Sequence, residues 1–257
     1  MFEEHISMVI GPLYVIIGTV ALFLMLRAGN MRRPARITVL IVSAILGFLA
    51  FTPMFPVQFQ QLLLGRGPED RPIIAAAAII LLLVLSTIAV GRIFCGYLCP
   101  IGAVQELMYF IPSKKLIGRY GRIFSIARSI VFVALIMSAV FGGIALLEWA
   151  GVTAFFHLRT RSPFFYIFAA ILIVSLFLYR PFCRIACPLG LLMSWSSRLN
   201  FFKIRTGSAC TNCTFCEKQC PTQTAILAPD RSGECYLCLR CADKCNQDAV
   251  VYRGRKD

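Results

Sequence analysis

The chain has 257 residues, 58% of them hydrophobic, and a formal net charge of +14 at pH 7. This composition is unlike that of an ordinary soluble globular protein. The positive charge falls mainly between long apolar runs, which fits basic loops on one side of a membrane better than a nucleic-acid-binding surface, so we expect no nucleic-acid partner.

Five apolar runs are long enough to cross a lipid bilayer, which takes roughly 20 apolar residues in a helix. They lie at about 8–26, 37–57, 73–94, 123–147 and 164–182. If the N-terminus lies outside, most basic residues before position 200 fall on the cytoplasmic side, as the positive-inside rule requires. Residues 1–200 are therefore expected to form a five-helix transmembrane domain, multi-pass in a bacterial or archaeal cytoplasmic (inner) membrane. The two histidines, His5 and His157, lie outside the runs, which excludes a transmembrane haem pair held by histidines.

The third and fifth runs end in the same motif. The first copy contains Arg92, Phe94, Cys95, Cys99, Pro100 and Gly102, and the second contains Arg180, Phe182, Cys183, Cys187, Pro188 and Gly190. Because two crossings separate the copies, both are expected at the cytoplasmic face, as an internal parallel repeat. We predict that the two copies together hold one further iron–sulfur cluster, with the ligands Cys95, Cys99, Cys183 and Cys187. The alternative is a pair of redox-active dithiols.

An arginine precedes the first cysteine of each copy by three residues. Arg92 and Arg180 are candidate cofactor-binding residues, because a guanidinium can offset the negative charge of a thiolate-ligated cluster. The competing interpretation makes them basic anchors that extend to the membrane surface. The sequence leaves both open.

From about position 207 the chain becomes polar and rich in cysteine. Residues 207–257 are expected to form a small α+β domain of the bacterial two-cluster ferredoxin type, because the spacing C-x2-C-x2-C-x3-C occurs twice. In such domains three closely spaced cysteines bind one cluster and the fourth binds the other. The expected ligands are Cys210, Cys213, Cys216 and Cys245 for one 4Fe–4S cluster, and Cys235, Cys238, Cys241 and Cys220 for the second. Zinc is disfavoured, because structural zinc usually takes two separated C-x2-C pairs.

A quinone site would need a few polar groups in an apolar cleft. The candidates are His157, Glu148, Gln58, Gln105 and Glu106. Each of them is more typical of an ordinary loop or interfacial residue.

With two C-x3-C-P motifs, apolar helices and the double ferredoxin pattern, the chain resembles the NapH/NosR-type membrane-bound 4Fe–4S ferredoxin-like proteins, a family of quinol dehydrogenase membrane components. The resemblance covers nearly the whole chain. It implies electron transfer between the quinone pool or a cytoplasmic donor and a partner oxidoreductase, such as a reductase, ferredoxin or flavoprotein. Quinol as the donor is implied by the family alone. NosR-like members carry a large flavin-binding domain for which the short outer loops have no room, and NapH-like members are often described with four helices.

Two other functions stay open on the sequence. The chain is similar to the CcoG family of copper reductases, which suggests a metal-handling reductase or assembly factor, and its paired cysteines would also suit a membrane thiol redox sensor. No nucleotide fingerprint or flavin-attachment motif is identifiable. We therefore expect an electron-transfer subunit of a larger oxidoreductase complex and not a complete enzyme.

Overall fold

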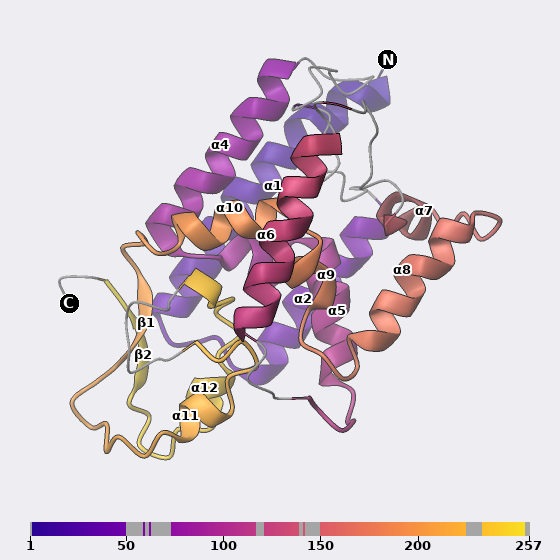
Figure 1. Cartoon of the computed structure of the whole chain (residues 1–257). Helices are drawn as coiled ribbons and strands as arrows, with labels where there is room; N and C mark the ends of the chain where they lie inside the picture. Colours follow the sequence, from indigo (N-terminus) through magenta and orange to yellow (C-terminus); the bar gives the residue numbers. More distant parts are fainter. Residues whose placement is uncertain are drawn as a thin grey trace.

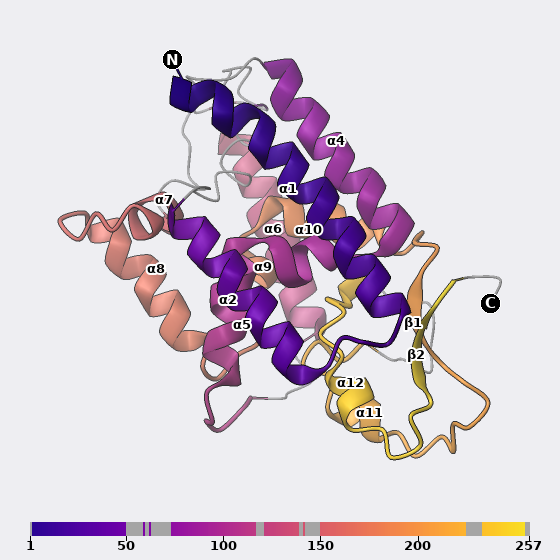
Figure 2. The same cartoon turned by 180° about the vertical axis from the view of Figure 1, so that it is seen from behind.

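The computed structural model describes residues 2–49, 59, 62, 73–116, 121–138, 141, 150–224 and 233–254. Helices make up most of this part of the chain, and a two-stranded ribbon with two short helices lies at one end of them (Figures 1 and 2). The longer helices are α1 (Phe2–Arg27), α2 (Arg33–Leu49), α4 (Ile73–Val90), α6 (Gly121–Met137) and α8 (Pro163–Val174), with the short α7 (Val152–Phe156) beside α8. The predicted helical character is confirmed.

The repeated motif has the same local structure in both copies: a long helix, a short helical turn and a second helix. The second cysteine of each copy, Cys99 or Cys187, is extended, with ψ of 117° and 113°, and the proline after it begins the next helix. Proline suits this place because it disfavours helical geometry in the residue before it and because the first helical N–H needs no partner. The elements are α4, η1 (Phe94–Leu98) and α5 (Pro100–Phe110) in the first copy, and α8, α9 (Pro181–Ile185) and α10 (Pro188–Ser196) in the second.

The prediction of five transmembrane helices is wrong. Within the described residues, no helix combines the length and the apolar character that crossing a bilayer requires. Helices α2 and α6 have 17 residues each and α8 has 12, so they measure about 25 Å and 18 Å against a hydrocarbon core of about 30 Å. The apolar run 164–182 is divided, because α8 ends at Val174 and Arg180 takes a left-handed φ of 49°.

The predicted localisation depended on those spans and is corrected with them. The multi-pass placement in a cytoplasmic membrane, the outside N-terminus and the contact with a lipid bilayer all assumed five crossings, which the described helices do not provide. Residues 50–57 and 142–147, the ends of two predicted spans, lie outside the described residues.

The C-terminal part is built on an antiparallel ribbon. Strands β1 (Lys203–Thr206) and β2 (Val250–Arg253) pair so that Lys203 lies opposite Arg253 and Thr206 opposite Val250. The cysteine-rich loops run between the two strands and include α11 (Phe215–Lys218) and α12 (Arg240–Asp243). We refer to residues 203–254 as the tail.

The tail packs directly on the helices. The hydroxyl of Tyr252 donates to the carbonyl of Val90 at the end of α4 (2.6 Å). The ring of Phe23 on α1 packs edge-on against Tyr252, with centroids 6.2 Å apart. Arg36 on α2 donates to the carbonyl oxygen of Cys238 and forms an ion pair with Asp243 of the tail. These contacts fix the cysteine loops against the ends of three helices.

Candidate metal centres

The first tail site is a cavity of about 180 Å³. Its lining includes the four cysteines that spacing assigns to one cluster: Cys210, Cys213, Cys216 and Cys245. Cys213 is exposed, whereas the other three thiols are partly buried. Four thiols around one enclosed space form a donor set that suits an iron–sulfur cluster.

The second tail site is a cavity of about 20 Å³, and its lining includes the other assigned set: Cys220, Cys235, Cys238 and Cys241. It is the more buried site. Burial and the charge of Cys238 raise the pKa of the Cys235 thiol to about 12, and burial and the charge of Glu106 raise that of Cys238 to about 11. Without a metal these thiols are therefore protonated at neutral pH, and binding of iron must release their protons.

The two cysteine loops share an unusual backbone conformation. Asn212 and Leu237, each two residues after the first cysteine of its loop, have φ of 54° and 55°, and Thr214 and Leu239 have φ of 59° and 57°. Non-glycine residues rarely adopt such values. The repetition of these strained positions in both loops indicates that the loops are shaped around equivalent sites.

The four cysteines of the repeated motif meet between the two copies. The pKa values of Cys99, Cys183 and Cys187 are each raised to about 12, first by burial and then by neighbouring thiols. Those neighbours are themselves members of the set of four, and every one of its possible pairs interacts electrostatically. We call Cys95, Cys99, Cys183 and Cys187 the shared thiols.

The glycine of each motif permits the tight packing around the shared thiols. A Cβ at Gly102 would lie 2.7 Å from the carbonyl oxygen of Cys95, and one at Gly190 would lie 2.6 Å from that of Cys183. Any side chain would therefore force the second helix of the motif away from the cysteine turn. This contact explains why both copies carry glycine there.

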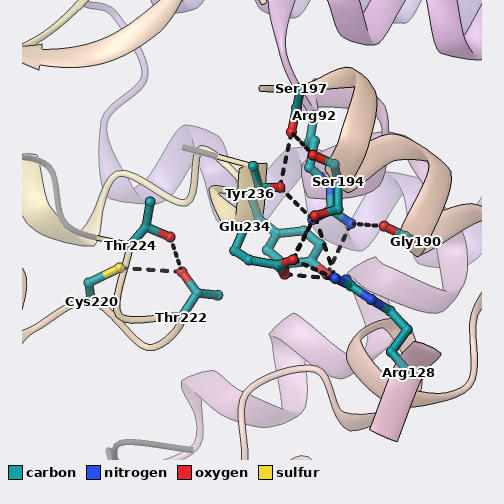
Figure 3. Close-up of polar contacts among 11 residues, drawn as sticks. Arg92, Arg128, Gly190, Ser194, Ser197, Cys220, Thr222, Thr224, Glu234 and Tyr236 are labelled. Carbon is teal, nitrogen blue, oxygen red and sulfur yellow. Dashed lines mark hydrogen bonds and ion pairs between the residues drawn. The ribbon is translucent and has the colours of Figure 1, made fainter. Parts of the chain in front are cut away.

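The two arginines bind the opposite copy of the motif. Arg92 of the first copy donates to the carbonyl of Gly190 (3.2 Å), as Figure 3 shows. Arg180 of the second copy donates to the carbonyl oxygens of Cys95 and Gly96, the latter at 2.6 Å. Both side chains are about 1% exposed, so the interpretation of the arginines as anchors that extend to a surface is wrong. The thiols of Cys95 and Cys183 are among the groups that raise the pKa of Arg92, and Cys183 is among those that raise the pKa of Arg180.

Each arginine has a carboxylate partner, and that of Arg180 is buried. The Nε of Arg180 lies 2.9 Å from Glu106 of α5, whose other oxygen pairs with Arg240 of the tail at 2.7 Å. Burial would raise the pKa of Glu106, but the charges of Arg180 and Arg240 outweigh burial and hold this pKa below its usual value. Glu106, one of the quinone candidates, is thus an ion-pair residue. The candidates Glu148 and Gln58 lie outside the described residues.

The carboxylate that pairs with Arg92 belongs to the tail. Glu234 lies 3.7 Å from Arg92, 2.6 Å from Arg128 and 2.6 Å from the hydroxyl of Ser194 (Figure 3). Glu234 and Tyr236 were not predicted from the sequence as site residues, although the centre of the Tyr236 ring lies 4.1 Å from the Arg92 guanidinium carbon. The available signal was their position on either side of Cys235, a predicted ligand.

The second tail site adjoins the shared thiols. A Cβ at Gly96, the residue after Cys95, would overlap the carbonyl oxygen of Tyr236, the residue after Cys235. The Tyr236 ring also packs with Tyr179 and Tyr109 in a small buried cluster against Cys95 and Cys238. One thiol from each site therefore touches the same aromatic cluster.

All twelve cysteines are free thiols. Within the described ranges, no three histidine, cysteine or carboxylate side chains converge closely enough to hold a single metal ion. A cubane is ligated by one thiolate at each of its four irons, so its ligands surround a larger volume than one ion occupies.

Comparison with known proteins places the repeated motif in context. The family model of a 4Fe-4S binding domain matches residues 72–118 and 163–207, the segments that carry the two motif copies. The uncharacterized protein MJ0749 of Methanocaldococcus jannaschii is 30% identical over 190 residues, which cover 71% of this chain and 72% of that protein. The putative electron transport protein YccM of Escherichia coli is 30% identical over 198 residues (68% of this chain, 55% of the relative). The ferredoxin-type protein NapH of Escherichia coli is 23% identical over 213 residues (76% and 72%). No solved structure matches the chain.

Proposed function

Because the chain belongs to the NapH/NosR-type family of 4Fe–4S ferredoxin-like proteins, we propose that it transfers electrons through three iron–sulfur clusters in series. That the protein has an iron–sulfur redox role follows from the family and from its 4Fe-4S binding domain. The number of clusters, their ligands and their order are the proposal. The first tail site holds one cluster, the second tail site holds another, and the shared thiols hold the third.

The observation that carries the proposal is the sorting of twelve cysteines into three sets of four. Two sets line separate tail cavities, in the combination expected of a two-cluster ferredoxin. The shared thiols interact in all their pairs although they come from two segments about ninety residues apart. Each set has the four thiols that one cubane requires.

The order of the three sites follows from their contacts. The first tail site contains the exposed Cys213, which makes it the end at which a soluble redox partner exchanges electrons. The second tail site lies between the first tail site and the shared thiols. Its Cys220 belongs to the first cysteine loop, and its Tyr236 packs in the aromatic cluster that contacts Cys95. The shared thiols form the inner end.

The protein supplies positive charge where cluster charge accumulates. When bound, a 4Fe–4S cluster accepts and releases one electron at a time, at a potential that depends on its surroundings. Arg92 and Arg180 place buried guanidinium groups beside the shared thiols and are fixed there by backbone carbonyls of the opposite copy. Glu106 and Glu234 form ion pairs with these arginines.

The donor and acceptor of the electrons stay predictions. Redox partner complexes are expected of this family, and a reductase, ferredoxin or flavoprotein would suit the exposed first site. Quinol remains a prediction of the resemblance. Two of the candidate residues for a quinone site already have other partners. Gln105 donates to the Cys183 sulfur, and Glu106 accepts hydrogen bonds from Arg180 and Arg240.

The test is to count iron and acid-labile sulfide in anaerobically prepared full-length protein. We expect twelve of each per chain, and four fewer in a variant with both Cys99→Ser and Cys187→Ser. Eight irons in the wild-type protein would rule out the shared cluster and favour the dithiol alternative, with its sensor or metal-handling roles. A variant with Ser197→Ala, which changes a nearby hydroxyl and no thiol, should keep twelve.

A further inference from the structure

Gln105 makes a direct contact with the shared thiols. Its side chain is fully buried on α5. The amide nitrogen donates to the sulfur of Cys183 at 3.5 Å and to the carbonyl of Ile101 at 3.2 Å. The amide oxygen accepts a hydrogen bond from the backbone N–H of Phe182 at 3.1 Å. A residue of the first copy thus binds the backbone and the sulfur of the second.

The orientation of the Gln105 amide is determined by its partners. The backbone N–H of Phe182 is a donor only, so the group facing it must be the oxygen of the amide. The nitrogen then faces Cys183, and its second proton goes to Ile101. Both ends of the amide are satisfied, which holds an N–H group directed at one sulfur.

The second copy has no equivalent donor. The position six residues after the second cysteine is Gln105 in the first copy and Met193 in the second. A thioether has no N–H to give, and the Met193 sulfur instead accepts a hydrogen bond from Thr87 at 2.9 Å. Both copies carry a hydroxyl side chain eight residues before the first cysteine, namely Thr87 in the first copy and Ser175 in the second. The repeat is therefore asymmetric at the residue that contacts a sulfur.

We propose that Gln105 is a positioning residue that raises the reduction potential of the shared cluster through its hydrogen bond to Cys183. This inference rests on the proposed shared cluster. Reduction adds one electron to the cluster and its thiolates, with no bond made or broken. An N–H directed at one thiolate stabilises the more negative state, so it favours reduction. Gln105 also makes Cys183 differ from its counterpart Cys95.

The experiment is a redox titration of the full-length, iron-loaded protein, followed by electron paramagnetic resonance. In Gln105→Met, which reproduces the residue of the second copy, one of the three clusters should titrate at a lower potential and the other two should be unchanged. Met193→Leu is the matched control, because it alters the equivalent position and removes no donor. It should leave all three potentials as in the wild type.

A second measurement needs no variant. With the glutamine side chains labelled with nitrogen-15, pulsed resonance on the reduced shared cluster should show coupling to a labelled nitrogen. This coupling decides the question if Gln105→Met loses iron.

An unchanged potential in a Gln105→Met protein with twelve irons, an equal shift in Met193→Leu, or the absence of nitrogen coupling would overturn the role of Gln105 alone. Eight irons in the wild-type protein would instead remove the shared cluster itself, and the role of Gln105 with it.

Discussion

The two copies of the cysteine motif place their cysteines alike but differ in the residues that follow the first cysteine. After the first cysteine, the first copy has Gly96, which lies against the carbonyl of Tyr236, and Tyr97, whose hydroxyl donates to the carbonyl of Leu237 (2.8 Å). The second copy has Arg184 and Ile185 at these places, and Arg184 lies over the ring of Phe124 on α6. At these two places the first copy contacts the tail, whereas the second contacts α6.

The difference extends to the partners of the arginines. Seven residues after the second cysteine, the first copy has Glu106 and the second has Ser194. Arg180 pairs with Glu106 of the first copy, whereas Arg92 pairs with Glu234 of the tail, which Ser194 holds by a hydrogen bond. The tail thus supplies the carboxylate that the second copy lacks. A repeat can thus duplicate a set of cysteines while the residues that differ between its copies determine how each copy contacts the tail.

The largest effect is expected from Glu106→Gln. The substitution keeps the shape of the side chain but leaves the charges of Arg180 and Arg240 without their carboxylate. Breaking a buried ion pair in this way costs about 3–5 kcal/mol of the free energy of unfolding. Urea unfolding of the iron-loaded protein, followed by circular dichroism, measures the loss.

The equivalent change in the second copy, Ser194→Ala, is the matched control. It removes one hydrogen bond to a charged group, which is worth about 1.5–3 kcal/mol, and leaves Glu234 paired with Arg128. Equal losses in the two variants would contradict the idea that the first copy provides the carboxylate that pairs with Arg180, whereas the tail provides the one that pairs with Arg92.

The next largest effect is expected from Gly96→Ala. The added Cβ would overlap a backbone carbonyl of Tyr236, which cannot rotate away as a side chain does. Overpacking of this kind costs about 1–3 kcal/mol, so the thermal midpoint should fall. Gly11→Ala on α1 is the control, because a Cβ there meets nothing within 4 Å and alanine favours a helix by up to about 1 kcal/mol. A Gly96→Ala protein as stable as the wild type would show that the first copy does not press against the tail.

These residues also show how far the sequence could predict the site. The two groups of cysteines that line the tail cavities match the groups predicted from spacing, because each loop of cysteines is local in the chain. The contacts of each arginine with the opposite copy and the roles of Gln105 and Glu234 depend on segments 40 or more residues apart in the chain, which no local pattern contains. The transmembrane prediction failed for a related reason. Apolar content alone does not reveal where a helix stops, and Arg180 leaves helical geometry inside a run predicted to be one helix.

The buried carboxylate of the first copy should also make stability depend on pH. The two arginines hold the folded-state pKa of Glu106 below its unfolded value of about 4.3. A lowered pKa contributes stability that is present above the unfolded value and is lost as pH falls below it. The stability of the wild-type protein should therefore decline as pH falls below about 4.3, and that of Glu106→Gln should decline less. Asp248→Asn, at an exposed position, should keep the wild-type slope, and a slope equally reduced there would contradict the assignment to Glu106.

The smallest effect is expected from Tyr97→Phe, which tests the contact of the first copy with the tail through a single atom. The Tyr97 hydroxyl is buried and donates to the carbonyl of Leu237, within the cysteine loop of the second tail site. Its loss should cost about 1 kcal/mol of the free energy of unfolding, whereas Tyr166→Phe, at a side chain that is 62% exposed, should cost nothing measurable. Because the ring of Tyr97 stays in place, packing is preserved and the cost reports the hydrogen bond between the two regions. If the free energy of unfolding changed equally little in Tyr97→Phe and Tyr166→Phe, the hydrogen bond to Leu237 would not stabilise the contact between the first copy and the tail. The difference between the copies would then depend on Gly96 and the carboxylates.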